Sequence, residues 1–472
     1  MRTHRLIGLV VLLASCSIGA GAPVPAPATQ PTFADVTVHD PDILREGDTF
    51  YIVGSHLGAA KSNDLMHWTL IDEGVHAGHK LIPDVTTQMK EALAWGQTRT
   101  FWAGSLVKLG DGRFAYYYSV CKGDSPRGAI GLALAQKPDG PYKHEAIIVK
   151  SGMWGQPGAD GTIYDAVKHP NAVDPHTFFD ATGQLWMTYG SYSGGIFIMK
   201  MNPATGLPTE GQGWGRKLLG GNHSRIEAPY VLYNPQTKFY YLFLSFGGLD
   251  SRGGYQMRIA RSKTPDGPFL SPGGRDMIDC HGPDRSFFDD RAIEPFGEKL
   301  LGNFELGEGE RRWGYASPGH NCAYYDADTG RSFVIFHTRF PGKGEFHQVR
   351  VHQLFFNTDG WPVMAPLRYA GETIGKSTKA DLAGEYQFLN HGHSITPDIV
   401  QPKHITLKAD GTITGDVTGR WMLSNEHDVS LTIDNTTFAG VTLKQWDESK
   451  QKWVQTFTAE HAGVCVWGVG MN

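Results

Sequence analysis

The sequence has little charge for its length and no cluster of positive charge. Only 19% of its 472 residues are Asp, Glu, Lys or Arg, and the formal net charge is -5. Proteins that bind a phosphate backbone carry a basic surface, and no Lys/Arg-rich block interleaves with aromatic residues here. We therefore expect no nucleic acid partner.

The first residues contain no hydrophobic run long enough for a transmembrane helix. Two arginines precede the short apolar stretch Leu6 to Ala14, which is typical of an export signal. Leu13-Ala14-Ser15-Cys16 resembles a bacterial lipobox, in which Cys16 would be lipidated, whereas Ala20-Gly21-Ala22 is a competing cleavage site. We expect a signal peptide at residues 1–22 and an exported protein that is extracellular, periplasmic or lipid-anchored. Membrane contact is expected only through a lipid on Cys16.

Cysteine is scarce. Four remain after Cys16, namely Cys121, Cys280, Cys322 and Cys465, and their spacing fits no zinc or redox motif. An exported protein meets an oxidising compartment. We expect buried apolar thiols, with a single disulfide as the alternative.

Glycine and aromatic residues are abundant instead. The 59 Gly, 12 Trp, 18 Tyr and 24 Phe indicate short strands, tight turns and many flat apolar rings, so the expected class is all-β. A chain of this length exceeds what one hydrophobic core usually fills. We expect one large domain and one smaller one.

A structural unit recurs five times in the first part of the sequence. Each copy runs from a polar or small residue through an apolar strand and a polar turn into an aromatic-rich strand, which is typical of an antiparallel hairpin. The copies are His39 to Ser55, Trp102 to Ser119, Val173 to Ser191, Ile226 to Ser245 and Gly319 to His337. Several are followed by a second strand pair with an Asp-Gly turn. Four strands per repeat predict a five-bladed β-propeller at residues 34–375; a β-sandwich, the alternative, does not predict five matching units.

The rest of the chain forms flanking segments. Residues 23–33 are Pro-rich and predict a linker, and residues 380–472 predict a small β-barrel that binds polysaccharide or covers one side of the propeller. His391 and His393 form an H-x-H pair without a nearby cysteine. We expect this pair in an exposed loop rather than at a metal.

The propeller prediction brings distant residues together. The innermost strand of every blade lines the central axis, so equivalent starting positions converge. An acidic residue at a strand start is ordinarily a solvated cap or turn residue, but here three share one repeat position, each close to a proline. The positions are Asp40, Gly104 (or Ala103), Asp174, Glu227 and His320.

Three carboxyl groups around one funnel suit glycosidic bond cleavage. That reaction needs a carboxylate to activate water and a carboxylic acid to protonate the leaving oxygen. We expect Asp40 to be the general base and Glu227 the general acid. Asp174 would raise the pKa of the acid by like-charge repulsion and orient it. Their positions on different blades leave room for a water molecule, as in inverting enzymes.

At these residues the sequence resembles glycoside hydrolase family 43, in particular the endo-α-1,5-L-arabinanases with an extra C-terminal β-domain. Val38-His39-Asp40-Pro41 is similar to the general-base motif, Ala172-Val173-Asp174-Pro175 to the pKa-modulator motif and Arg225-Ile226-Glu227-Ala228-Pro229-Tyr230 to the general-acid motif. The resemblance also includes Gly190 to Gly195 and Pro318-Gly319-His320-Asn321. One departure is an alanine at 228, where many relatives have glycine.

The resemblance implies calcium beside His320. Calcium prefers oxygen ligands, so a single imidazole would need water molecules to complete the shell. The alternative for His320 is a hydrogen-bonded side chain that fills the propeller axis.

Substrate contacts are expected around the funnel. An aromatic face can stack on a sugar ring, and Trp102 starts the second blade, although packing between blades would explain it too. Tyr192, Phe101 and Trp95 are weaker aromatic candidates. The polar side chains beside the catalytic motifs are Asn171, Ser191 and His223.

Three hypotheses follow from the sequence. The first is an endo-acting hydrolase that cleaves internal α-1,5-L-arabinofuranosidic bonds of arabinan. The second is an exo-acting arabinofuranosidase or β-xylosidase of the same family, and the third is a non-catalytic sugar-binding propeller. The complete set of three carboxylates favours an enzyme. We expect a monomer with a polysaccharide substrate.

Overall fold

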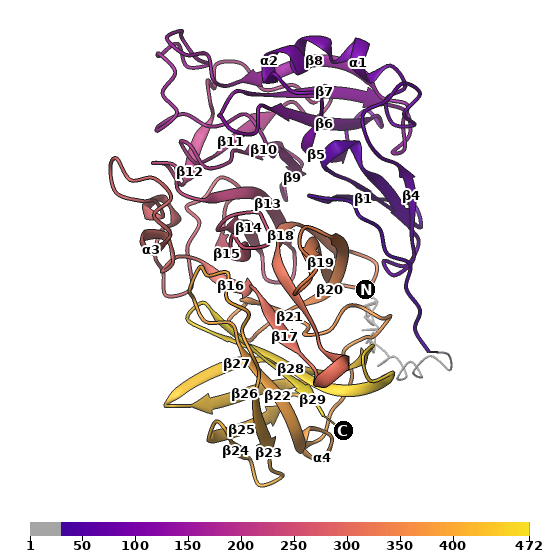
Figure 1. Ribbon diagram of the computed structural model, residues 1–472, viewed down its shortest axis with the longest axis vertical. Helices are drawn as coiled ribbons and strands as arrows, with labels where there is room; N and C mark the ends of the chain where they lie inside the picture. The colour runs from indigo at the N-terminus through magenta and orange to yellow at the C-terminus, as the bar shows by residue number, and fades with distance from the viewer. Residues whose placement is uncertain (1–29, 472) are drawn as a thin grey trace, which may run out of the picture.

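The computed structural model describes residues 30–471 and is an all-β protein with a few short helices (Figure 1). The predicted signal peptide, Cys16 and most of the predicted linker precede residue 30 and lie outside the described residues. Within residues 30–471, no helix has the length and apolarity needed to cross a membrane.

Four sheets of the described residues do not pair with one another and are arranged like the blades of a propeller. The first contains β1 (Asp42–Glu46), β2 (Thr49–Val53), β3 (Ala59–Ser62) and β4 (Trp68–Asp72). The second contains β5 (Trp102–Lys108), β6 (Phe114–Cys121), β7 (Gly128–Ala135) and β8 (Lys143–Lys150). The third contains β9 (His176–Phe179), β10 (Leu185–Tyr189), β11 (Ile196–Met201) and β12 (Arg216–Leu219). The fourth contains β17 (Phe304–Leu306), β18 (Trp313–Asp326), β19 (Arg331–Arg339), β20 (His347–Phe356) and β21 (Pro362–Met364).

A twelve-stranded sheet joins the propeller-like body to a closed barrel. Its first four strands are β13 (Ile226–Asn234), β14 (Phe239–Phe246), β15 (Gln256–Ser262) and β16 (Glu298–Leu301). The barrel strands are β22 (Gly384–Asn390), β23 (Lys403–Leu407), β24 (Thr412–Gly415), β25 (Gly419–Ser424), β26 (Asp428–Ile433), β27 (Thr436–Asp447), β28 (Lys452–His461) and β29 (Val464–Gly470). The eight strands close because β29 pairs with both β22 and β28. The predicted all-β class and C-terminal barrel are therefore confirmed, whereas the sheets as paired give four separate blades, not five.

Helices occupy only connections. They are α1 (Val85–Gln88), α2 (Lys90–Gly96), α3 (Asp290–Ile293), α4 (Lys379–Leu382) and the 3-10 turns η1 (Ser55–Leu57), η2 (Met277–Asp279) and η3 (Gly309–Arg311). The tight hairpin turns depend on glycine, as the sequence indicates. Gly183 between β9 and β10 has φ +85°, and Gly360 between β20 and β21 has φ +72°, a conformation that residues with a Cβ adopt at a cost.

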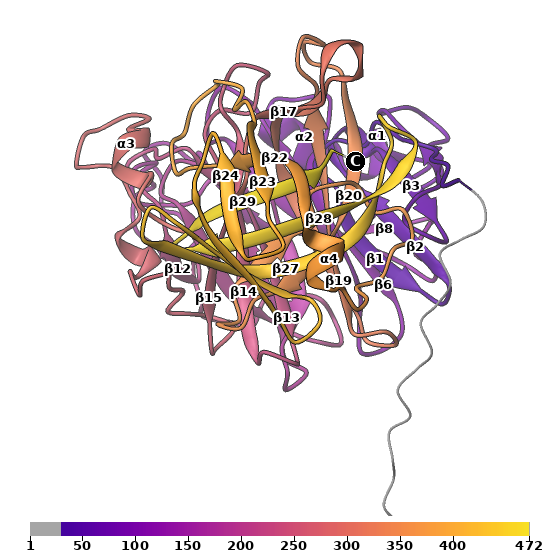
Figure 2. The ribbon, with the colours of Figure 1, turned by 90° about the horizontal axis from the view of Figure 1, so that it is seen from below.

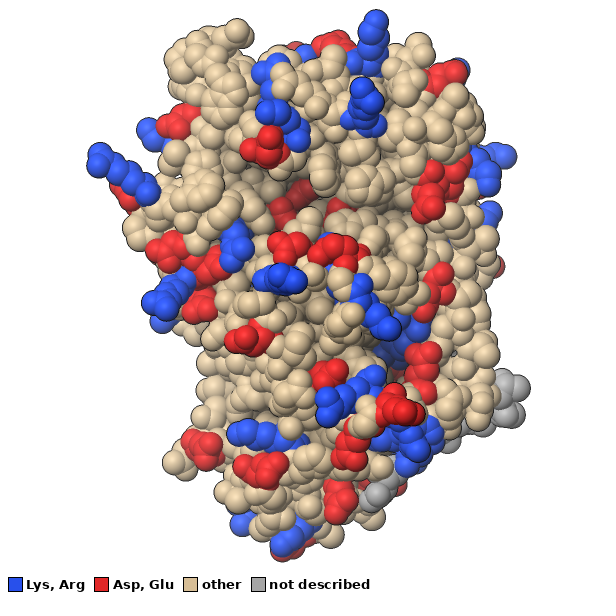
Figure 3. All heavy atoms as spheres, in the orientation of Figure 1, with Lys and Arg blue, Asp and Glu red and all other residues tan. Residues whose placement is uncertain are grey.

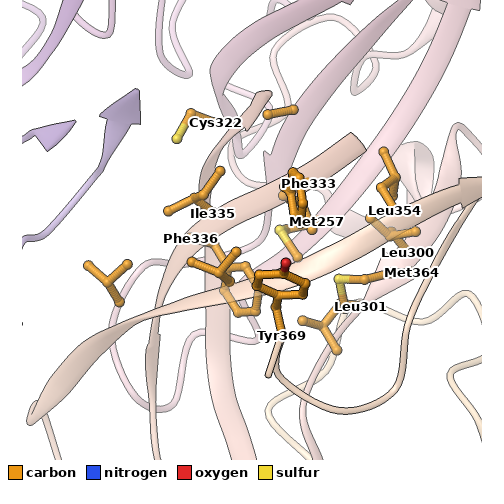
Figure 4. Close-up of a cluster of buried hydrophobic side chains, with 14 of the residues drawn as sticks. Met257, Leu300, Leu301, Cys322, Phe333, Ile335, Phe336, Leu354, Met364 and Tyr369 are labelled. Carbon is orange, nitrogen blue, oxygen red and sulfur yellow. The ribbon is translucent and has the colours of Figure 1, made fainter. Parts of the chain in front are cut away.

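A shared hydrophobic core joins the last propeller sheet to β15 and β16. Figure 4 shows side chains from both sheets in one cluster, with Met257 and Leu300 facing Phe333 and Leu354. These residues are at most 2% exposed. Burial of each such side chain stabilises the fold by about 1.5–3 kcal/mol, so the two sheets are fixed relative to each other.

The barrel covers one side of the propeller-like body, as Figure 2 shows from below. The parallel pairing of β16 with β29 and an edge-to-face contact of 5.3 Å between Phe304 and Trp467 connect the two parts. His391 packs against Trp467 at this contact and is 2% exposed. The prediction of an exposed H-x-H pair is therefore wrong for His391, because tertiary packing places its loop beneath the propeller.

The cysteines behave as the sequence predicts. Those at 121, 280, 322 and 465 are free and buried. Burial raises the pKa of each thiol, so they contribute as small apolar side chains rather than as nucleophiles.

Candidate active site

The repeat positions share an unusual backbone conformation. Asp40, Asp174 and His320 have positive φ values of 56°, 54° and 44°, and Ala228, beside Glu227, has φ 56°. The pairing register shifts at these places in β13 and β18. A bulge re-aims the side chains of a strand. The same local distortion therefore recurs at the inner end of several sheets, where it directs polar side chains to the axis.

These positions line one pocket of about 470 Å³. Asp40, Asp174, Glu227 and His320 all belong to its lining, and Figure 3 shows acidic groups at the bottom of a hollow in this face. The volume lies within the range of sites for small ligands. The residues predicted as substrate contacts line the same pocket: Trp102, Asn171, Ser191, Tyr192 and His223.

Asp40 sits in a dense network of polar side chains. Its Oδ2 accepts a short hydrogen bond from Ser55 Oγ and lies 2.8 Å from His39 Nδ1. Its Oδ1 lies 3.1 Å from His320 Nδ1 and 3.4 Å from His337 Nδ1. The backbone N–H of Asp40 donates to the same nitrogen of His337 at 3.1 Å. Both carboxylate oxygens are therefore held in one orientation.

This network keeps Asp40 ionised. Burial alone would raise its pKa, but the charges of His320 and His39 outweigh burial and hold the pKa well below 3.8. Burial lowers the pKa of His320 in turn, yet Asp40 and Asp174 raise it to about 9. An ionised carboxylate beside a protonated imidazole follows at neutral pH.

Glu227 receives two hydrogen bonds from the walls of the pocket. Ser191 Oγ donates to Oε2 at 2.7 Å, and the hydroxyl of Tyr255 donates to Oε1 at 2.8 Å. Asp174 stands beside it, where Oδ2 accepts a long bond of 3.4 Å from the N–H of Ala228. The backbone of the general-acid motif thus positions the neighbouring carboxyl group.

Asp174 and Glu227 hold a proton more strongly than ordinary carboxyl groups. Burial raises the pKa of Asp174 to about 8, with further increases from the charges of Glu227 and Asp40. Burial also raises the pKa of Glu227, although His320, Ser191 and Tyr255 oppose the increase. The pocket therefore contains one strongly acidic carboxyl group and a pair that retains a proton at higher pH, which is the division that acid-base chemistry requires.

Two of the three weaker aromatic candidates lie elsewhere, whereas Tyr192 lines the pocket. Phe101 is fully buried in the core between the first two sheets. Trp95 packs under the Arg127 guanidinium at 4.4 Å and donates its N–H to two backbone carbonyls. Neither residue lines the pocket. Trp102 does, and its ring N–H donates to Cys121 O at 2.8 Å, which leaves a ring face for the funnel.

Several residues of the site carried no repeat signal. Tyr255 directly precedes β15, and Phe287 and Phe288 belong to the loop between η2 and α3 that forms the rim of the pocket. Phe287 is 66% exposed and Phe288 41%. Two adjacent exposed aromatic residues in a polar loop were the available signal for the rim, because exposed apolar patches mark binding sites.

The donor set around His320 can accommodate a hydrated cation. Oδ1 of Asp40 is buried and lies 3.1 Å from His320 Nδ1, and the carboxylates of Asp174 and Glu227 line the same pocket as His320. Oxygen donors are what calcium requires. His39, Asp40 and His337 also form a compact donor cluster, but His337 Nδ1 already accepts the Asp40 N–H.

Carboxyl groups whose pKa values are shifted in opposite directions within one pocket are what glycosidic bond cleavage requires, and they point to a glycoside hydrolase. The comparisons with known families agree. The model of glycosyl hydrolases family 43 matches residues 29–290, and that of a C-terminal lipocalin-like domain of the same family matches residues 366–468. The chain belongs to glycoside hydrolase family 43.

Similar proteins match over nearly the whole length. The extracellular endo-alpha-(1->5)-L-arabinanase 2 of Bacillus subtilis is 53% identical, and the match covers 97% of this chain and 98% of the relative. The extracellular endo-alpha-(1->5)-L-arabinanase of Thermotoga petrophila is 52% identical over 93% and 95%. A crystal structure of the endo-1,5-alpha-L-arabinanase from Thermotoga petrophila RKU-1 has a TM-score of 0.90 at 51% identity and covers 94% of this chain and 100% of that chain.

Proposed function

We propose that the protein is an inverting endo-α-1,5-L-arabinanase. The observation that carries the proposal is that Asp40 and Glu227 line one funnel while their pKa values are shifted in opposite directions. The substrate class is supported by two relatives, more than half identical over nearly their whole length, whose names describe endo-acting arabinanases.

Asp40 activates the attacking water molecule in this proposal. Its ionised carboxylate accepts a proton from a water molecule while the water oxygen bonds to the anomeric carbon. Ser55 and His39 hold the carboxylate in one orientation. This preorganisation removes the cost of aligning the base during the reaction.

Glu227 protonates the leaving group in the same displacement. Its carboxyl group donates a proton to the glycosidic oxygen as the bond from that oxygen to the anomeric carbon breaks. Attack and departure on opposite faces of the sugar invert the configuration. Asp40 is then protonated and Glu227 ionised, and exchange of one proton with solvent restores both. Asp174 is the proposed pKa modulator that orients Glu227: the two carboxyl groups repel each other when both are ionised, so the pair loses its last proton at a raised pKa.

The pocket rim contributes the substrate contacts in this proposal. Trp102 and Phe287 offer aromatic faces for arabinose rings, while Asn171 and His223 offer hydrogen-bonding groups for hydroxyls. Ser191 acts through its bond to Glu227, so it positions the acid as well as lining the pocket.

We further propose that β13 to β16 form the fifth blade. Their order and antiparallel pairing match those of the other four-stranded sheets, and Glu227 stands at the inner strand as Asp40 and Asp174 stand at theirs. The continuation into the barrel through β29 is an addition at the outer edge of this blade. The proposed domains remain residues 34–375 and 380–472.

Calcium is proposed beside His320. The ion would displace the proton of the His320 imidazole, and water molecules that the surrounding carboxylates orient would complete its shell. When bound, calcium supplies positive charge that stabilises developing negative charge in the funnel. The proton transfers described above are carried out by this chain's carboxyl groups.

Export is proposed from residues 1–22 together with the word extracellular in the names of both relatives. A lipid anchor at Cys16 and free secretion are the two forms of this proposal. A monomer that acts on polymeric arabinan outside the cytoplasm is the expected functional unit.

Product sizing tests the function. Purified protein is incubated with linear arabinan and with aryl glycosides of arabinose and xylose. Short arabino-oligosaccharides from the polymer, with little cleavage of the aryl glycosides, support endo action. Monomer alone indicates the exo-acting alternative, and binding without any product indicates the non-catalytic one.

A further inference from the structure

A second cavity lies where the last propeller sheet meets the barrel. Its volume is about 370 Å³, and it shares no lining residue with the catalytic funnel. One wall comes from the hairpin of β17 and β18 and from β20, and the other from the end of β27. In Figure 1 this hairpin extends from the propeller-like body down to the barrel.

Aromatic rings from both parts of the protein form the walls. Trp313 and Tyr315 come from β18, Phe340 follows β19, and Trp446 comes from β27. Tyr315 and Trp446 are fixed in the core at 2% and 4% exposure, while Trp313 and Phe340 are partly exposed. The indole N–H of Trp446 has no acceptor among the described residues. Flat faces with a few hydrogen-bonding groups are what a sugar ring requires from a binding site.

The charged side chains of the cavity balance. Four arginines line it, namely Arg311, Arg312, Arg350 and Arg368. The carboxylates that line it or pair with these arginines also number four, namely Asp35, Glu305, Glu310 and Glu448. A balanced set does not select a charged ligand. It offers donors and acceptors to hydroxyl groups.

Two of these groups are available for a ligand. Within residues 30–471, the side chains of Arg311 and Glu310 make no ion pair, and both are exposed. They lie in η3 at the tip of the hairpin. Gln387 of β22 fixes the base of the tip, because its amide accepts a hydrogen bond of 2.8 Å from Gly307 N–H and donates one of 3.3 Å to Gly307 O. The cavity is therefore preformed rather than a gap between loosely connected parts.

We propose that this cavity is a second, non-catalytic binding site for a neutral oligosaccharide segment of the polymer that the funnel cleaves. The identity of the sugar rests on the proposed function, whereas the chemistry of the cavity specifies an uncharged polyhydroxylated chain. A second site on the same protein makes the encounter of the funnel with the polymer intramolecular. The second site thereby raises the affinity for polymer, and it leaves the rate at which a short substrate is cleaved unchanged.

Calorimetric titration of the inactive variant Glu227→Gln with arabinohexaose tests the proposal. We expect two sites per chain, and one after the further substitution Trp313→Ala. Arg311→Ala combined with Glu310→Ala leaves the aromatic core untouched and should weaken the second site about fivefold to tenfold. Arg420→Ala, an exposed arginine of β25 outside both cavities, is the matched control and should change nothing.

Activity separates this proposal from the proposed function. In the active protein, Arg311→Ala with Glu310→Ala should raise KM for linear arabinan about threefold to tenfold and leave kcat/KM for arabinotriose unchanged. A single site in Glu227→Gln, or two sites that survive both sets of substitutions, would overturn the second site. Failure of the wild-type protein to cleave arabinan overturns the proposed function instead. Titration of the same variants with xylohexaose then shows whether the cavity binds a neutral oligosaccharide.

Discussion

The hydroxyl of Tyr255 donates a hydrogen bond of 2.8 Å to Oε1 of Glu227. Tyr255 is fully buried, so this bond lies in a medium of low polarity, where hydrogen bonds to a charged group are strongest. It stabilises the ionised form of Glu227 and opposes the increase in pKa that burial causes. The pKa of the proposed acid is therefore set by burial, which raises it, and by its hydrogen-bond partners, which lower it.

Tyr255→Phe removes one of the hydrogen bonds that lower the pKa of Glu227. The pKa of Glu227 should rise by about one unit. Because a general acid works in its protonated form, the alkaline limb of kcat/KM should move to higher pH. A pH profile on arabinotriose measures the shift. Tyr189→Phe, which deletes another buried phenol bonded to a backbone carbonyl, is the control, and an equal shift in that variant would show that the effect is not local.

Asp174→Asn should move the same limb in the opposite direction. The two carboxyl groups compete for a proton, and the last proton leaves at a pKa raised by burial and by repulsion. A neutral amide removes the repulsion, so Glu227 loses its proton at lower pH. An alkaline limb that remained in place would contradict the role of Asp174 as pKa modulator. Asp40 is ionised in both proteins, so the acidic limb should be unchanged.

Phe287→Ala tests the rim of the funnel. Phe287 is 66% exposed, so its loss should leave the free energy of unfolding unchanged. If the ring stacks on arabinan, KM for polymer should rise about threefold to tenfold, which corresponds to about 1 kcal/mol. Met422→Ala, with 56% exposure in the barrel, is the control. Unchanged steady-state kinetics would remove Phe287 from the substrate contacts.

Ala228→Gly should stabilise the protein. Ala228 has φ +56°, in the left-handed region that costs a residue with a Cβ about 1–2 kcal/mol. Glycine removes this cost but loses some chain entropy, so we expect a gain of about 0.5–1 kcal/mol in the free energy of unfolding. Urea denaturation measures it. Decreased stability would mean that the Ala228 methyl group makes packing contacts that outweigh the backbone cost.

Glu298→Gln should change the pH dependence of stability. Glu298 is fully buried in β16, and burial raises its pKa well above 4.5. A group whose pKa is raised on folding stabilises the protein below its unfolded pKa and loses that contribution as pH rises. The wild-type protein should therefore lose stability relative to the variant between pH 5 and pH 8. The melting temperatures of the wild-type protein and the variant are compared at pH 5 and at pH 8. The same difference at both would contradict an elevated pKa of Glu298.

The repeats explain why the centre of the site could be predicted from sequence. Asp40, Asp174, Glu227 and His320 occupy the same point of successive strands, and the structure brings them into one pocket. Hairpin turns and strand positions are local properties, specified by glycine and by alternating aromatic residues. Those local signals suffice to align positions that are hundreds of residues apart.

The surroundings of the centre could not be predicted in the same way. Phe287 lies in a loop without a repeat partner, and Tyr255 reaches Glu227 only through the tertiary fold. His391 looks like a loop residue in sequence, yet packing against Trp467 buries it. The joining of β16 to β29 depends on a single parallel pairing between distant segments, for which neither segment carries a local signal.

The anomeric configuration of the first product tests the central claim most directly. Proton NMR follows the hydrolysis of arabinotriose within seconds of mixing, before the new reducing end equilibrates. Attack by a water molecule activated by Asp40, with Glu227 as the acid, predicts that the β-anomer appears first from the α-linked substrate. Initial appearance of the α-anomer would indicate a covalent intermediate and contradict the assignment of Asp40 as a general base.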